Sequence, residues 1–385
     1  MERNEMTIQQ FADNVLDHLF DTHPGMEETH NAEIKEVLKN NGQMREALVL
    51  KANDENIAPT IYLEKFFDDF KDGALLGDIC DKIIDMYEQS RNPQNISVDF
   101  FTDFDQAKER LAMKVVNAEK NAQMLEDTPH FKFGDLAAIF QVQVDSNEYG
   151  SAVITVKDQH MKMWDTNPQS MLEYAKANME EKQPVRIQSM MDVLREMMGS
   201  NAPEGLLPEE EPKMYVMTND SKINGAAAMI FTDKIDDFAK DIGANLFILP
   251  SSIHEVLLVP DNGEINVKEL EDMVKSVNST QVSPDEVLSD NVYVYDKEAK
   301  SLQIASTKEP LVLECVNNEQ TRKNTEKSAQ KSAEKAGHKA ADKSERASEE
   351  AHSIKDRLAE GKEKSAMSLG DVADKLPQEQ GRDLR

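Results

Sequence analysis

The runs LAAIFQVQV (136–144) and SAVITV (151–156) are separated by the polar turn SNEYG (146–150). Apolar runs of this length, rich in Val, Ile and Phe and joined by a turn that contains Gly, are typical of paired β-strands. Two more such runs, LFILP (246–250) and EVLLVP (255–260), follow later in the chain. Helical patterns lie between these strands without regular βαβ alternation. The sequence therefore predicts an α+β fold of mixed hairpins and helices, in one large or two packed subdomains.

The N-terminal part predicts helices and one hairpin. Residues 7–20 carry a helical apolar stripe with Thr7 as N-cap. NAEIKEVLK and QMREALVLK flank Asn40-Asn41-Gly42, and Asn-Gly supplies the positive φ angles that a hairpin turn needs. Two long amphipathic helices are expected next, in ALLGDICDKIIDMYEQS (74–90) and in DFDQAKERLAMKVVNAEKNAQML (103–125).

The C-terminal part predicts a helix from Pro168 to Lys182, with Asn167 as its cap. AAAMIF (226–231) is interpreted as a strand that leads into a helix over 232–242. Gly150-Ser-Ala-Val-Ile and Gly225-Ala-Ala-Ala-Met would then each open a strand after a polar turn. This similarity suggests two copies of a hairpin-plus-helix unit, although chance recurrence of a common hairpin explains it equally well.

These patterns predict a division of the chain into five segments. The expected segments are an N-terminal helix/hairpin/helical subdomain (1–125), a strand-hairpin and helix unit (126–200), an acidic Pro-rich linker (201–212), a second strand-hairpin and helix unit (213–310), and a Lys/Glu/Ala-rich tail (317–385). Between Asn317 and Ser353 the tail has no Leu, Ile, Val, Phe, Tyr or Trp. Such a composition cannot build a core, so the tail is expected to be disordered or a solvated helix.

The formal net charge of the chain is −29, and almost all of it lies outside the tail, which holds 15 basic and 14 acidic residues. An acidic body of residues 1–316 repels phosphates and has few clustered cations with which to release counterions. We therefore expect no direct binding of nucleic acid by the body. The acidity serves solubility, or it forms a surface that meets a basic partner, and a protein partner is expected.

Two cysteines, Cys80 and Cys315, show neither CxxC spacing nor any other pairing pattern, which suits a reducing compartment. MERNEMTIQQF at the start has no basic region followed by an apolar run, so no secretory signal is expected. No window approaches the length of apolar sequence that spans a membrane. The sequence predicts a cytoplasmic protein without a membrane association.

The sequence contains no GxGxxG, P-loop, GxSxG or kinase signature, and we expect no cofactor. Asp99, Asp103 and Asp105 could hold a divalent metal, but they precede a predicted helix, where Asp103 or Asp105 serves better as a cap. The three histidines His18, His23 and His30 lack a fourth zinc ligand. No metal site is expected.

The candidate binding residues are Ser251, Ser252, His254 and Glu255, in the stretch ILPSSIHEVLLVP (248–260). Leu258 stands where HExxH would need its second histidine, so the metalloprotease motif is absent. Two apolar runs that we expect to be buried strands flank this polar junction, and rigid support under polar groups is what a binding site needs. We expect Ser251, Ser252 and His254 to border a concavity. The alternative is that the serines satisfy backbone groups of a turn while His254 faces solvent.

Four segments together resemble a known family: APTIYLE (58–64), FFTDF (100–104), LPSSIHEVLLVPD (249–261) and STQVSPDEVLSDNVYVYD (279–296). In this order they are similar to uncharacterised bacterial proteins grouped as domain of unknown function five-six-eight-eight, common in anaerobic gut Firmicutes and often found among genes of mobile elements. The resemblance covers roughly residues 10–305 and implies no activity and no catalytic residues.

From these observations we expect a non-catalytic binding or accessory protein, and the resemblance implies an origin in a mobile genetic element. Two other functions remain open. One is an acidic decoy that occupies a nucleic-acid-binding protein by presenting phosphate-like charge. The other is a hydrolase built on the junction of Ser251, Ser252 and His254.

Overall fold

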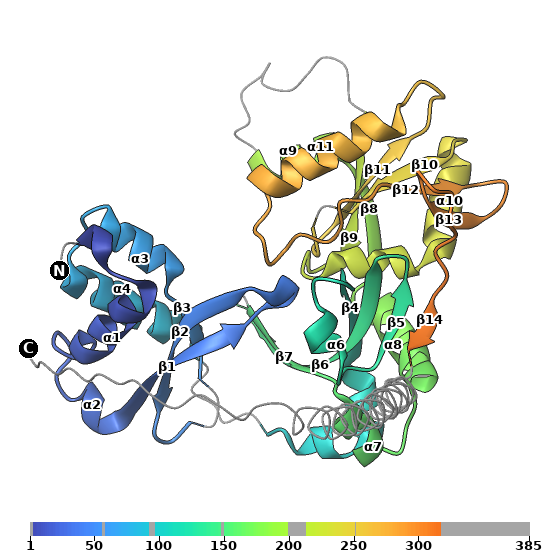
Figure 1. Cartoon of the computed structure of the whole chain (residues 1–385). Helices are drawn as coiled ribbons and strands as arrows, with labels where there is room; N and C mark the ends of the chain where they lie inside the picture. Colours follow the sequence, from blue (N-terminus) through green and yellow to red (C-terminus); the bar gives the residue numbers. More distant parts are fainter. Residues whose placement is uncertain are drawn as a thin grey trace, which may run out of the picture. The chain divides into compact units, whose positions relative to one another are not determined.

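The computed structural model describes residues 3–55, 58–91, 97–147, 150–198, 213–250 and 252–316. The predicted linker (201–212) and tail (317–385) lie outside these ranges and stay predictions. Within the described residues, helices accompany three sheets whose strand pairs are all antiparallel (Figure 1). The predicted α+β fold class is therefore confirmed.

The first sheet has the order β1-β2-β3 and packs against three helices through a core of its own. Its elements are η1 (Arg3–Glu5), α1 (Ile8–His18), α2 (Met26–Thr29), β1 (His30–Leu38), η2 (Asn40–Gly42), β2 (Met44–Ala52), β3 (Thr60–Tyr62), α3 (Glu64–Lys71) and α4 (Leu76–Ser90). Thr7 caps α1 as expected, because its hydroxyl accepts from Gln10 N–H while the Gln10 side chain bonds back to Thr7 N–H. The predicted hairpin is also confirmed, with φ of 60° at Asn41 and 68° at Gly42.

The second sheet has the order β14-β5-β6-β4, with β7 paired to β6. Its strands and the short helices before them are η3 (Asp99–Thr102), α5 (Phe104–Ala107), η4 (Lys108–Arg110), β4 (Leu111–Asn117), α6 (Ala122–Leu125), β5 (His130–Phe133), β6 (Leu136–Asn147), β7 (Gly150–Thr155) and β14 (Glu314–Val316). The hairpin predicted over 136–156 is thus confirmed as β6–β7. Asp103 caps α5, since its carboxylate accepts from Asp105 N–H.

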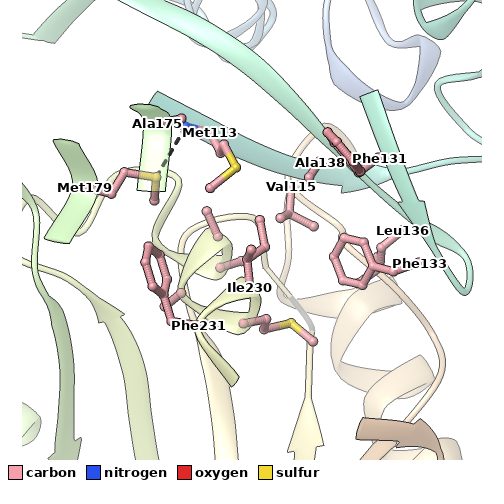
Figure 2. Close-up of a cluster of buried hydrophobic side chains, with 14 of the residues drawn as sticks. Met113, Val115, Phe131, Phe133, Leu136, Ala138, Ala175, Met179, Ile230 and Phe231 are labelled. Carbon is pink, nitrogen blue, oxygen red and sulfur yellow. Dashed lines mark hydrogen bonds between the residues drawn. The ribbon is translucent and has the colours of Figure 1, made fainter. Parts of the chain in front are cut away.

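The helix predicted over 103–125 is wrong in its middle, where β4 forms instead. Met113 and Val115 alternate into the main core and lie near Ile230 and Phe231, as Figure 2 shows. Adjacent Val115 and Val116 favour extended backbone, and β6 offers β4 a full ladder of partners. The segment therefore forms a strand, in which side chains alternate between two faces, although the spacing of the same apolar residues also fits a helix.

The third sheet has the order β13-β12-β10-β11-β9-β8. Its elements and the helices around it are α7 (Asp158–Met163), α8 (Pro168–Lys182), β8 (Val185–Ser189), α9 (Met190–Met198), β9 (Tyr215–Asn219), η6 (Gly225–Ile230), α10 (Thr232–Ile242), β10 (Leu246–Leu249), β11 (Val256–Pro260), α11 (Val267–Thr280), β12 (Tyr293–Asp296) and β13 (Ser301–Ile304). Asn167 caps α8 and Pro168 opens it, as predicted. β8 pairs with β9, so the segments 126–200 and 213–310 contribute strands to one sheet.

The strand predicted at AAAMIF is wrong, because residues Gly225–Ile230 form the 3-10 helix η6. All six residues are buried, and Figure 2 shows Ile230 and Phe231 within the cluster that also receives β4. Small alanine side chains let this short helix pack closely against β4 of the second sheet and β9 of the third. The suggested second hairpin is therefore absent from the described residues, and the two-copy interpretation fails with it.

Candidate functional site

The residues of β4 that point away from the main core form the floor of a cavity. Lys114 lies opposite Ile139 of β6, and Gln141 of β6 lies opposite Thr155 of β7. Because strand side chains alternate between faces, Lys114, Ile139, Gln141 and Thr155 share the face opposite to Met113. All four line a cavity of about 380 Å³.

Segments from distant parts of the chain form the cavity walls. The full set of lining residues is Leu38, Lys39, Asn40, Lys114, Val116, Met124, Ile139, Gln141, Thr155, Asn224, Ile253, His254, Asp285 and Glu286. Its apolar members are Leu38, Val116, Met124, Ile139 and Ile253, and its charged members come from the hairpin, from β4 and from the segments that carry His254 and Glu286. A smaller cavity of about 60 Å³ shares Gln141 and Asn224 and extends the polar lining toward Gln143 and Gln183.

Lys114 is the most unusual charge in this site. Its side chain is half-buried, and its Nζ has no hydrogen-bond or ion-pair partner among the residues that the structure describes. Burial lowers the pKa of Lys114 from 10.5 to about 8, and the positive charge of Lys39 acts in the same direction. The carboxylates of Asp285 and Glu286 oppose the shift without reversing it. An amine with this pKa is partly neutral near pH 8.

The second cation, Lys39, is fixed at the edge of the cavity by Tyr62. Lys39 Nζ donates to the Tyr62 hydroxyl at 3.1 Å and lies 4.5 Å from the centre of its ring. This arrangement orients Lys39, but Tyr62 supplies no carboxylate that would pair with it.

His254 lies in the cavity wall with both ring nitrogens engaged. The backbone N–H of Asn224 donates to Nδ1 at 3.3 Å. A backbone amide can only donate, so this contact makes Nδ1 the acceptor and places the ring proton on Nε2. Nε2 lies 3.5 Å from Oε1 of Glu286. The imidazole therefore presents a donor toward a carboxylate at the cavity.

The loop that carries His254 is held on both sides by backbone contacts. Ile253 N–H donates to the Glu286 carbonyl at 2.9 Å, and the Thr218 hydroxyl donates to the His254 carbonyl at 2.8 Å. Gly225 packs closely against this loop, and a Cβ at residue 225 would overlap the Thr218 hydroxyl and the His254 carbonyl. The position of His254 thus depends on a glycine at 225.

The tip of the β1–β2 hairpin completes the cavity by docking on the segment 284–287. The Asn41 side chain donates to the carbonyls of Pro284 and Val287 at 2.9 and 2.7 Å, and it accepts from Asn121 Nδ2 at 2.9 Å. Asn41 N–H donates in turn to Asn121 Oδ1 at 2.8 Å. This amide network is buried, and it fixes Leu38, Lys39 and Asn40 in the wall.

The carboxylate of Asp285, which lies beside this network, takes part in an ion pair. Its carboxylate accepts from the Ser283 hydroxyl at 2.5 Å and from Arg45 Nη2 at 3.1 Å. Burial by itself raises the pKa of Asp285, but the bonds from Ser283 and Arg45 outweigh it, and the net shift is downward. Asp285 is therefore a paired carboxylate, in contrast to Lys114.

The structure separates the four residues that the sequence placed in one candidate site. His254 lines the cavity, in agreement with the expected concavity. Ser252 is only 6% exposed, its hydroxyl accepts from His254 N–H at 3.0 Å, and it does not line this cavity, so the expectation that it borders the concavity is wrong. A serine inside a tight turn satisfies the backbone there. Glu255 is half-buried and does not line this cavity, and Ser251 lies outside the described residues.

Sequence reasoning missed Lys114 and Glu286. A lysine between Met113 and Val115 looks solvated if the segment is a helix, whereas strand alternation would have set it apart as a charge on a sheet face. Across the described ranges, no group of three or more His, Cys, Asp or Glu side chains is arranged to hold a metal ion. None of the helices in those ranges combines the length and apolarity needed to cross a bilayer.

Comparison with known proteins gives a family without an assigned activity. Neither a curated protein nor a solved structure matches the chain. A family model described as a family of unknown function (DUF5688) matches residues 8–297, which include every residue of the cavity wall. The chain is therefore a member of this family of unknown function.

Proposed function

We propose that this protein is a non-catalytic binding protein whose cavity takes a small organic acid with an apolar body. The observation that carries this proposal is the Lys114 ammonium, which faces a cavity without a carboxylate partner among the described residues. A half-buried charge without a partner is costly, and an anionic ligand would supply the missing interaction.

The charges around Lys114 favour a ligand anion at that point. Lys39 adds a second positive charge, while Asp285 is already paired with Arg45. Glu286 faces the donor nitrogen of His254. Among the described residues, the carboxylates near Lys114 and Lys39 are thus engaged by other groups, and neither lysine forms an ion pair, although the chain as a whole is strongly acidic.

The size and the remaining lining suit a small ligand. Ligand cavities in proteins are typically about 300–1,000 Å³ and mostly apolar, with a few polar groups that fix orientation. Here Val116, Ile139 and Ile253 supply apolar walls, and Gln141 and Asn224 supply amide groups.

The hydrolase alternative receives no support from the described residues. The Ser252 hydroxyl accepts from a backbone N–H of its own turn, and both nitrogens of His254 are directed to other groups. A nucleophile needs a base within hydrogen-bond reach, and no such pair of Ser252 and His254 is present.

Calorimetric titration with α-hydroxyisocaproate, which has a carboxylate and a branched apolar body, tests the proposal. We expect the full-length protein to bind it, and Lys114→Met to weaken binding at least about tenfold, since a charge-assisted hydrogen bond contributes about 1.5–3 kcal/mol. The matched control is Lys132→Met, which removes an exposed lysine from β5 of the same sheet and should leave affinity unchanged. Equal affinity of all three proteins, or no binding by the unmodified chain, would overturn the proposal.

A further inference from the structure

Lys114 combines two features that turn a lysine into a nucleophile. Its amine is removed from bulk water on the floor of a cavity, and a second cation, Lys39, lines the same cavity. Both features favour the neutral amine, which is the form that attacks carbonyl carbon. A binding role alone would require neither of them, because a fully charged lysine holds a carboxylate at least as well.

Resting on the proposed function, we propose that the cavity binds 2-oxo acids and that Lys114 Nζ forms a reversible imine with their keto group. The ligand class is set by the site. The carboxylate of a 2-oxo acid would interact with the positive charge of Lys39, and its apolar body would pack against Val116 and Ile139. Its keto carbon is the atom that the Lys114 amine can attack.

The chemistry balances without any oxidant or reductant. The Nζ lone pair forms a bond to the keto carbon while the carbonyl π electrons move to oxygen. A proton passes from nitrogen to that oxygen and gives a carbinolamine. Loss of the second nitrogen proton and of the hydroxyl group, together as one water molecule, leaves a C=N bond. Hydrolysis by one water reverses the sequence and returns amine and ketone.

The proton steps are assigned to water and not to a side chain of the cavity wall. His254 directs its Nε2–H to Glu286 and accepts at Nδ1 from Asn224 N–H, so both ring nitrogens are already engaged. The protons that leave nitrogen and reach the departing hydroxyl are therefore exchanged with solvent, and His254 holds the Glu286 carboxylate beside the cavity.

The charged and titratable groups around the amine are Lys39 of the hairpin, His254 of the loop, and Asp285 and Glu286 of the facing segment. With a pKa of about 8, roughly a tenth of Lys114 is neutral at pH 7, against less than about a thousandth of a surface lysine. Reactivity with a ketone should therefore rise with pH up to about 8 and then level off.

Reductive trapping of the full-length protein provides the test. The protein is incubated with α-ketoisocaproate and sodium cyanoborohydride, digested, and mapped by mass spectrometry. We expect the adduct to concentrate on Lys114 at least about a hundredfold above exposed lysines such as Lys132, in line with the difference in neutral amine. Excess α-hydroxyisocaproate, which has the same carbon skeleton but no ketone, should protect Lys114. Adducts spread evenly over surface lysines would overturn the inference.

A second variant separates this inference from the binding proposal. Lys114→Arg keeps the positive charge but has no amine that can form an imine. It should retain binding of α-hydroxyisocaproate within about threefold and lose the specific adduct completely. If the unmodified protein binds α-hydroxyisocaproate and yet no adduct forms at Lys114, the imine is refuted while the binding function stands. If neither acid binds, the binding function itself is refuted.

Discussion

The change Lys114→Met is expected to stabilise the protein although it removes a residue of the candidate site. In the folded chain the pKa of Lys114 falls from 10.5 to about 8. One pKa unit corresponds to ~1.4 kcal/mol, so the folded state disfavours the charged amine by roughly 3 kcal/mol. The amine faces a cavity and is only half-buried, which reduces this penalty, and we expect a gain of about 1–2 kcal/mol. Methionine fills a similar volume without the charge.

The pH dependence of this gain has a definite sign. The pKa of Lys114 is lower in the folded state than in the unfolded state, so between about pH 8 and 10.5 the unfolded chain binds more protons at this residue. Stability of the unmodified protein from this group therefore rises with pH across that window. Lys114→Met has no amine to titrate at this position. Its gain in the free energy of unfolding over the unmodified protein should therefore be greatest below about pH 8 and should shrink toward zero as pH approaches 10.5.

Urea unfolding at pH 7 and at pH 10, followed by circular dichroism, measures both quantities. Lys132→Met is the control, because an exposed lysine on β5 should change stability by less than about 0.5 kcal/mol. Lys114→Met could prove less stable than the unmodified protein at pH 7, or its gain in stability could fail to change with pH. Either result would show that the pKa of Lys114 is not lowered by burial, and the argument for the site would fail.

Four further outcomes are expected. Gly225→Ala should destabilise the fold by about 1–3 kcal/mol through overlap with the His254 loop, and a melting temperature equal to that of the unmodified protein would contradict this. Asn41→Ala should lower the free energy of unfolding in urea by about 2–4 kcal/mol, because two carbonyls lose their hydrogen-bond donor and alanine is placed at positive φ. Asn41→Gly should avoid the share of this loss that comes from the positive φ, since glycine tolerates that angle. Since the pKa of Asp285 is lowered on folding, its stabilising effect should be present above about pH 4 and lost in more acidic solution, so Asp285→Asn should flatten the acid limb of the stability curve. Residues 1–316 should not shift duplex DNA in a gel at low salt, and salt-sensitive micromolar binding would be the contrary result.

Local sequence rules predicted those elements whose determinants are adjacent in the chain. Thr7 and Asn167 supply caps within their own first turns, and the Asn41-Gly42 pair supplies the hairpin angles by itself. β4 and η6 depended on partners far away in sequence. The apolar residues around Lys114 satisfy helical and strand spacing equally, and only pairing with β6 decides between them.

The candidate site shows the same division. His254 was found because polar residues between two apolar strands are visible in the sequence, and the flanking strands do form. Ser252 was misjudged because its hydroxyl is used by a turn whose geometry the sequence does not reveal. Lys114 escaped notice because its environment includes Lys39, Asp285 and Glu286, which lie far from it along the sequence.

The docking of the hairpin tip makes occupancy of the cavity measurable at a distance. A ligand there would touch Lys39 on one side and Glu286 on the other, and so would oppose release of the hairpin from the segment that holds it. At a ligand concentration one hundred times the Kd, this linkage adds about 2.7 kcal/mol against any opening that empties the site. Amide hydrogen exchange in β1 and β2 should then slow on addition of ligand, although most of these residues never contact it. The hairpin would thus act as a built-in reporter with which unlabelled compounds can be screened.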